Sequence, residues 1–248
     1  MTYENPFNPA KLAAMREEIR RDGLVADRFL ANDPDVPTFG LNLACAWPFP
    51  AAWRESYEQM ARKLSALGPD VYVYPFSCTH ITLVTLGSFA RHIKPAAELV
   101  AALGANIPRI LTALSPLFTE NSPERIQPFT LQPQAPVLAR GAAFLPVLNP
   151  DGEVARLRQR VVELLQQANE PLHRELAEHG FNVPRIIHST VLRFIRPPAN
   201  LEGFLSRFDK IAAETEFPPL VVKEIVLTSE TKPYMRSGET PGRFRIRS

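Results

Sequence analysis

The sequence carries one small pattern twice: a histidine two residues before a threonine, inside an apolar, strand-like segment. The first copy is CTHITLVTLG at residues 78–87, and the second is IHSTVLR at residues 187–193. Each copy closes a run of elements in the order strand, helix, strand. We interpret this as an internal repeat that survives in the order of elements rather than in letter identity. Two similar lobes facing each other would place the two equivalent strands across a common cleft.

The first 37 residues lie outside this repeat. Asn8 and Pro9 precede a helical pattern and Gly23 follows it, which is the arrangement of an N-cap, a first helical residue and a C-terminal glycine. Residues 31–37, ANDPDVP, form a turn-rich linker. We therefore expect an N-terminal helical extension and linker at 1–37, followed by a bilobal domain at 38–248.

Proline makes up 25 residues, about a tenth of the chain against a usual share of about 5%, and divides the sequence into short elements. The pattern predicts strands at residues 38–47, 71–74, the first His-x-Thr copy as far as Gly87, 185–195, 220–229 and 243–246, with two more within 128–148. It predicts helices at residues 51–67, about 93–104, from 151 through a helix-prone segment to Gly180, and 201–213. Residues 107–118 fit a second helix or a loop, and residues 232–242, KPYMRSGETPG, a polar loop.

Composition excludes several classes of protein. A chain of 248 residues with 45% hydrophobic residues can bury a large core, as one domain or as two lobes that share a core. The two cysteines form no CxxC pair and no Cys/His cluster at zinc spacing, which argues against a disulfide framework and a structural metal. No segment approaches about 18 continuous apolar residues, and the N-terminus lacks a signal-peptide core. We expect a cytoplasmic protein without a membrane segment, and a monomer is compatible with the sequence.

The charge is uneven along the chain. Residues 1–124 hold 11 Lys/Arg and 13 Asp/Glu, a net −2, whereas residues 125–248 hold 17 and 13, a net +4. A mildly basic second half fits either an anionic ligand or solvated arginines on helix surfaces, and the sequence leaves both open.

The His-x-Thr spacing has a chemical meaning in a strand, because residues i and i+2 point to the same face. His80 and Thr82 would present an imidazole beside a hydroxyl, and His188 and Thr190 would do the same across the cleft. One neutral histidine can take a proton from water while a protonated one delivers a proton to a leaving oxygen, and hydroxyls can donate to phosphoryl oxygens. That set suffices to hydrolyse a phosphodiester without a metal. The alternative is that each histidine is a hydrogen-bonded core residue, but two matching pairs favour the functional interpretation.

HITLVTLG resembles the first motif of the 2H phosphoesterase superfamily, whose 2′-5′ RNA ligase-like members carry His-x-Thr-Leu-x-x-Leu-Gly. HSTVLR resembles the second motif, His-x-Thr-x-x-Arg. The resemblance extends in element order from about residue 38 to the C-terminus. It implies an α+β, bilobal fold with two antiparallel-rich sheets facing across a central cleft and helices outside. It also implies His80 and His188 as the acid/base pair, Thr82 and Thr190 as phosphate ligands, and no metal or other cofactor.

Further substrate contacts are less constrained. Arg193 matches the motif arginine, but its offset of five from His188 places it on the opposite strand face unless a bulge or the strand end turns it. Aromatic rings near the motifs could stack on a base: Tyr74, Phe76, Phe194 and Tyr234. Arg236 accompanies Tyr234 in the polar loop. We interpret the other histidines as surface residues: His92, His173 and His179.

The sequence thus predicts a hydrolase acting on a nucleotide or RNA end, with a 2′,3′-cyclic phosphate or a 2′-5′ linkage as the scissile group. The same site run backwards could ligate, with a ribose hydroxyl in place of water. The alternative from another class is a nucleotide- or RNA-binding module that keeps the pocket with little or no turnover. A third is a structural protein whose histidines belong to the core.

Overall fold

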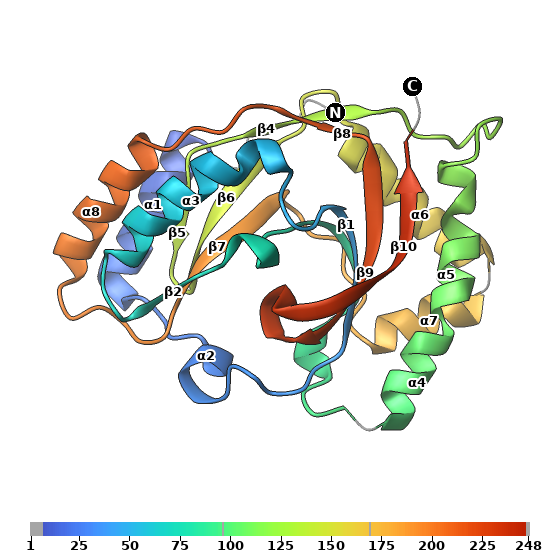
Figure 1. The fold of residues 1–248 in the computed structure, drawn as a ribbon, viewed down its shortest axis with the longest axis horizontal. Helices are drawn as coiled ribbons and strands as arrows, with labels where there is room; N and C mark the ends of the chain where they lie inside the picture. The colour runs from blue at the N-terminus through green and yellow to red at the C-terminus, as the bar shows by residue number, and fades with distance from the viewer. Residues whose placement is uncertain (1–6, 96, 169, 247–248) are drawn as a thin grey trace.

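Two antiparallel β-sheets form the frame of the protein in a computed structural model, which describes residues 7–95, 97–168 and 170–246. The four-stranded sheet has the order β10-β9-β1-β3, and the six-stranded sheet has the order β2-β7-β6-β4-β8, with β5 paired to β6. Helices α1, α3 and α8 lie on one side of the molecule and α4 to α7 on the other, with the strands between them (Figure 1). The expected α+β architecture, with antiparallel sheets and outer helices, is confirmed.

The strands are β1 (Gly40–Ala46), β2 (Val71–Val73), β3 (Ile81–Gly87), β4 (Phe129–Pro133), β5 (Val137–Ala139), β6 (Ala142–Leu148), β7 (His188–Phe194), β8 (Leu220–Val222), β9 (Glu224–Lys232) and β10 (Ser237–Arg245). The helices are α1 (Pro9–Asp22), α2 (Arg28–Asn32), α3 (Arg54–Ser65), α4 (Ala97–Ala105), α5 (Ile107–Leu114), α6 (Glu153–Ala168), α7 (Glu170–Glu178) and α8 (Leu201–Ala213). Short 3₁₀ turns are η1 (Ala51–Trp53), η2 (Phe76–Cys78), η3 (Phe89–Arg91), η4 (Ser115–Leu117) and η5 (Pro233–Met235).

The repeat inferred from the sequence has a counterpart in strand pairing. Strand β3 carries the first Thr and pairs with β1, the strand that precedes helix α3. Strand β7 carries the second pair and pairs with β6, the strand that precedes helix α6. The residues that fill the space between sheets and helices form one continuous hydrophobic core that draws on both sheets, among them Leu43, Leu83, Leu145 and Val191. The two halves therefore share a core.

The N-terminal segment packs onto this frame. Asn8 caps α1 as expected, because its Oδ1 accepts the Lys11 amide at 2.9 Å. Ile19 and Leu24 are buried in the shared core, and α1 packs against β5. A short helix that the sequence did not predict, α2, interrupts the segment, with Asp27 as its N-cap. The division of the chain after residue 37 stays a prediction.

Three sequence predictions of strands and loops were wrong in detail. Residues 128–148 form three strands, because both the 134–136 segment and the turn at Gly141 interrupt the run. The expected strand at 220–229 is two strands, β8 in the six-stranded sheet and β9 in the four-stranded one, so the chain changes sheet at Lys223. The expected loop at 232–242 is mostly strand β10, which pairs with β9.

Among the described residues, one helical stretch, Val100–Leu117, is long and apolar enough to cross a membrane. Its 18 residues have a mean hydropathy of 1.2, and core helices of soluble proteins can have the same length and composition. In the fold this stretch is divided among α4, α5 and η4, and 33% of it is buried.

The turn between β9 and β10 is held by a buried carboxylate. Met235 donates its amide to Glu230 Oε2 at 2.9 Å, and Asn42 Nδ2 lies 3.4 Å from Glu230 Oε1. Glu230 is only 3% exposed, and burial raises its pKa from 4.5 to about 7, because the charged form loses its hydration. Both Tyr234 and Met235 adopt left-handed backbone angles in this turn, with φ of 65° and 57°.

Glu230→Gln is expected to change how stability depends on pH. A raised pKa in the folded state favours folding below about 4.5 and loses that contribution as pH rises through about 7, an effect of about 3 kcal/mol. The wild type should therefore lose this much between pH 4 and pH 8 relative to Glu230→Gln, as measured by urea denaturation at both pH values. Glu239→Gln, at an exposed position on β10, is the matched control. Identical pH dependence of the wild type and Glu230→Gln would contradict the assignment.

Candidate active site

His80 lies immediately before β3, in the bend between η2 and the strand, rather than within the strand. Its Nδ1 lies 2.9 Å from the Cys78 carbonyl. A carbonyl only accepts, so Nδ1 carries the proton and Nε2 is left with its lone pair. Thr79 fixes the bend, because its hydroxyl donates to the Phe76 carbonyl at 2.7 Å and accepts the Phe49 amide at 3.0 Å. The imidazole thus has a defined tautomer on a restrained backbone.

His188 is the first residue of β7 and is half-buried. Its ring packs edge-on against Phe144 of β6, with ring centroids 5.5 Å apart. The Ile186 carbonyl, two residues back, raises the pKa of this ring as the Cys78 carbonyl raises that of His80. For His188 the geometry is less regular, since Nδ1 makes no hydrogen bond within the described part of the chain. Each histidine thus has a carbonyl two residues back that raises its pKa, but only for His80 does a hydrogen bond fix the tautomer.

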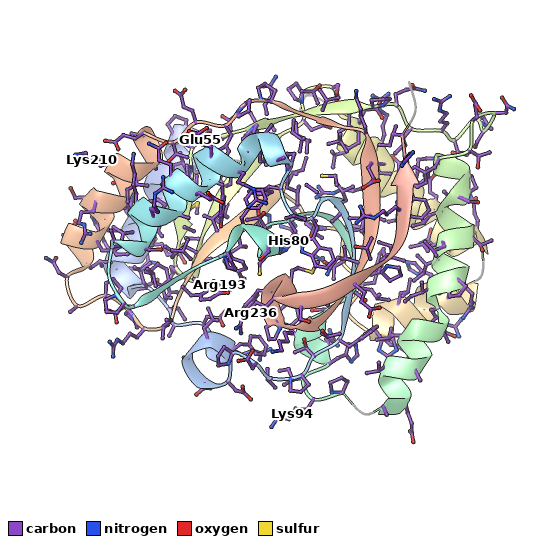
Figure 2. All side chains as sticks on the ribbon, in the orientation of Figure 1. Glu55, His80, Lys94, Arg193, Lys210 and Arg236 are labelled. Carbon is purple, nitrogen blue, oxygen red and sulfur yellow. The ribbon has the colours of Figure 1, made fainter. Side chains whose placement is uncertain are left out.

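The pKa values connect the two histidines. The pKa of His188 is lowered to about 4, chiefly by burial and in smaller part by the positive charges of His80, Arg158 and Arg193. Burial also lowers the pKa of His80, with a smaller contribution from Arg193. His80 and Arg193 are therefore close enough to His188 for their charges to reach it, and Arg193 is close enough to reach His80. Figure 2 shows His80 and Arg193 in the middle of the molecule, whereas Glu55 and Lys210 lie on its outer edge.

Matching β-bulges decide which side chains share the site face. Ala143 and Phe144 pair with Leu192 and Thr190, so Val191 is an extra residue in β7. The bulge reverses the alternation, and His188, Thr190 and Arg193 are the half-buried residues of this strand, while its other residues are buried. The bulge therefore turns Arg193 to the same strand face as His188, although Arg193 lies five residues after it.

Strand β3 has the same irregularity. Leu43 and Ala44 pair with Val84 and Thr82, so Leu83 is the extra residue. Thr82 and Thr85 are consequently the half-buried positions of β3, and Thr85 corresponds to Arg193 in the other half. The hydroxyls of Thr82 and Thr190 have no hydrogen-bond partner among residues 7–95, 97–168 and 170–246, which leaves them available to a ligand.

Arg193 is held by three groups from distant parts of the chain. Its Nε donates to the Tyr74 hydroxyl at 3.0 Å, and its Nη1 donates to Asp27 Oδ2 at 3.1 Å. The guanidinium carbon lies 4.3 Å from the centre of the Tyr234 ring, whose hydroxyl donates to the same Asp27 oxygen. The sequence analysis missed Asp27. Its only recognisable feature in the sequence is its place as a helix N-cap, which indicates a local role.

The predicted stacking aromatics are buried. Tyr74 is 1% exposed, Tyr234 7% and Phe76 8%, and the first two use their hydroxyls to hold Arg193 and Asp27. Stacking of these rings on a base stays a prediction that their burial does not support. Phe194 is fully buried in the core.

Arg236 lies near the centre of the view in Figure 2. Its Nη1 donates to the Pro34 carbonyl and lies 3.4 Å from Asp35 Oδ1.

Of the histidines interpreted as surface residues, His92 is buried, with 6% of its surface exposed, so for this residue the interpretation was wrong. It packs against the ring of His179 at 5.0 Å.

Arg158 is a second residue that the sequence analysis missed. It comes from α6 and is 9% exposed, and its Nε donates to the bulge carbonyl of Leu83 at 2.8 Å. Its Nη2 donates to the Ile186 carbonyl at 3.3 Å. In the sequence, Arg158 could have been noticed because it lies on the apolar face of the helix, four residues after Val154 and three before Val161.

In the described ranges, no group of three or more His, Cys, Asp and Glu residues could hold a metal.

Comparison with known proteins shows the fold. No protein-family model matches the sequence, and no curated protein matches it. The crystal structure of TT0787 of Thermus thermophilus shares 18% identity at a TM-score of 0.55, covering 84% of this chain and 98% of that one. The conserved protein of unknown function ATU0111 from Agrobacterium tumefaciens shares 13% identity at a TM-score of 0.59, covering 87% and 90%. E. coli LigT is 20% identical over 86% of this chain and 99% of its own, at a lower TM-score of 0.45. The shared fold rests on the first two structures, and it is the fold that the sequence resemblance implies.

Arg158→Met should raise the pKa of His188 from about 4 towards 6.5, because the substitution removes a neighbouring positive charge. The measurement is an NMR titration of the imidazole signals, assigned with a His188→Gln variant. Arg156→Met is the control, since Arg156 lies on the same helix with 64% of its side chain exposed. An unchanged His188 pKa in Arg158→Met would show that this charge does not reach the site.

Proposed function

We propose that the protein is a metal-independent phosphodiesterase of the 2H type, which hydrolyses a 2′,3′-cyclic phosphate or 2′-5′ phosphodiester of a nucleotide or RNA end. The observation that carries the proposal is that the charges of His80 and Arg193 both act on His188, which joins a residue immediately before β3 of one sheet to two residues on β7 of the other. The shared fold and the two His-x-Thr motifs support the same interpretation of the site. A cation and two unpaired hydroxyls beside two imidazoles suit an anionic phosphate ester.

The chemistry follows from the fixed tautomer of His80 and the position of its counterpart. Thr82, Thr190 and Arg193 would donate to the non-bridging oxygens of the phosphate. A neutral histidine takes a proton from water as the new oxygen–phosphorus bond forms. A protonated histidine gives its proton to the ribose oxygen as the old bond breaks. The product is a phosphate monoester and a free ribose hydroxyl.

The electrostatic effect between the two rings suggests their roles. The positive charge of a protonated His80 lowers the pKa of His188 and so favours a neutral His188 beside it. We therefore assign His80 as the general acid and His188 as the general base. A bound phosphate adds negative charge between the two rings and raises the pKa of both, which favours the protonated acid in the complex.

The second candidate is a nucleotide- or RNA-binding module with little or no turnover. One observation favours it: the pKa of each histidine is lowered from its usual 6.5, so the free protein holds less of the protonated acid at neutral pH than ordinary histidines would supply. Turnover separates the candidates, because binding alone needs neither imidazole to change its protonation state.

Replacing either His80 or His188 by alanine should lower kcat by about three orders of magnitude, because acid and base steps contribute about 10²- to 10⁴-fold each. The assay follows hydrolysis of nucleoside 2′,3′-cyclic phosphates and 2′-5′ dinucleotides in the presence of EDTA, with the product isomers identified. His173→Ala is the control, at a half-buried histidine that packs against Phe181. Full activity in both alanine variants, or a strict need for added metal, would refute the mechanism. Binding of these nucleotides without any turnover would favour the second candidate.

The pH dependence of kcat/KM should be bell-shaped, with its maximum at acidic pH. The free enzyme needs His80 protonated and His188 neutral. Activity should therefore fall as pH drops through about 4, where His188 takes up a proton, and fall on the alkaline side as His80, whose pKa burial lowers, loses its proton. The kcat profile at saturating substrate should lie at higher pH, because the bound anion raises both pKa values. Initial rates from pH 3.5 to 8.5 measure both profiles. A kcat/KM that keeps rising above pH 7 would contradict the need for a protonated histidine whose pKa is lowered.

A further inference from the structure

We propose that Asp27 is a positioning residue for Arg193, so that the N-terminal segment, residues 7–37, completes the phosphate site. This inference rests on the proposed function, since it gives Arg193 the role of a substrate contact. It assigns a part in the site to a segment that lies outside the repeat and outside the sequence resemblance.

Asp27 is held rigidly next to the strand that carries Arg193. Its backbone amide donates to the carbonyl of Phe194, the residue after Arg193, at 2.7 Å. Its Oδ1 accepts the amides of Phe29 and Leu30 at 3.0 and 3.1 Å, which caps α2. The residue is 8% exposed. One carboxylate oxygen is thus used to fix the residue, and the other is left for Arg193.

The hydrogen bonds of Arg193 define which part of it can meet a substrate. Its Nε is taken by Tyr74 and its Nη1 by Asp27. Nη2 has no partner within residues 7–95, 97–168 and 170–246, although 27% of the side chain is exposed. The guanidinium is planar, so two fixed nitrogens fix the direction of the third. Arg193 would therefore offer a substrate one terminal nitrogen rather than the two-pronged fork of a free arginine.

Tyr234 reinforces this arrangement at a cost to the backbone. Its hydroxyl donates to Asp27 Oδ2 while its ring supports the guanidinium. To do so it occupies a turn in which two consecutive residues with side chains, Tyr234 and Met235, have positive φ. Such conformations cost energy and persist where the surrounding structure holds them, often at functional sites. The hydrogen bond from the Met235 amide to Glu230 holds this turn.

The same segment also reaches the other side of the site. Phe7 packs against Phe144 with ring centroids 5.3 Å apart, and Phe144 packs against the His188 ring. The N-terminal segment therefore contacts the neighbours of His188 through Phe7 and Arg193 itself through Asp27. Two separate contacts from one segment make it part of the site's support.

Asp27→Asn tests the inference, because asparagine keeps the size and the cap but loses the charge that orients Arg193. We expect kcat/KM for a 2′,3′-cyclic mononucleotide to fall about ten- to a hundredfold, the range for a charge-assisted hydrogen bond, mainly through a higher KM. Asp33→Asn, at an exposed turn position in the same segment, should leave kcat/KM unchanged. In an Arg193→Met background, Asp27→Asn should have almost no further effect, because the residue on which it acts is gone. Thermal denaturation of each variant reports on folding separately.

A second measurement is independent of turnover. In the wild type, the Nε proton of Arg193 should exchange slowly with water, because it is donated to Tyr74; its NMR signal is identified by its absence in Arg193→Met. Asp27→Asn should speed this exchange and Asp33→Asn should not.

The outcomes separate the two proposals. If the wild type hydrolyses none of the phosphodiesters but the Nε signal responds to Asp27→Asn, the proposed function fails and the positioning role stands. If the wild type is active and Asp27→Asn matches Asp33→Asn in both kcat/KM and exchange, the positioning role is overturned. An equal loss of activity from Asp27→Asn with and without Arg193 would also overturn it, since that pattern belongs to a purely structural residue.

Discussion

The buried guanidinium of Arg158 ties the two His-x-Thr strands together. It donates to a carbonyl of β3 in the four-stranded sheet and to a carbonyl just before β7 in the six-stranded sheet. A buried cation is costly unless its hydrogen bonds are made, so the two strands are held at the separation that satisfies both. The spacing of the two imidazoles depends on that separation, and the charge of Arg158 adds to the effect of burial on the pKa of His188.

The site is also defined by the burial of its imidazoles. Burial is the largest cause of the low pKa of both histidines, and the nearby cations act in the same direction. In such surroundings charges interact strongly, so an anion that binds there changes the protonation of its neighbours by binding. Under the proposed function, substrate binding and proton uptake would therefore be coupled. In the free protein, burial and the nearby cations favour the neutral form of both imidazoles.

Local patterns in the sequence predicted much of the fold. The capped helix after Asn8, the helix at 201–213 and the two motif strands were recognisable, because helix caps and apolar periodicity are local signals. The change of sheet at Lys223 and the third strand within 128–148 were not, since they depend on which partners the strands find. In the site, the His-x-Thr pairs were visible from spacing alone. Asp27 and Arg158 were not, because Asp27 contacts Arg193 at a distance of 166 residues along the chain, and Arg158 contacts Leu83 and Ile186 at 75 and 28 residues.

The two bulges have a consequence for the direction of binding. Equivalent irregularities bring Thr85 to the site face in one half and Arg193 in the other. The pseudo-symmetry of the fold is thereby broken by a single cation, at a position where the opposite half has a neutral hydroxyl. A perfectly two-fold site would accept a phosphodiester in either orientation. Under the proposed function, the two ends of a bound ester would meet unlike surroundings, and this one pair of non-identical residues would set the direction in which a nucleotide chain binds.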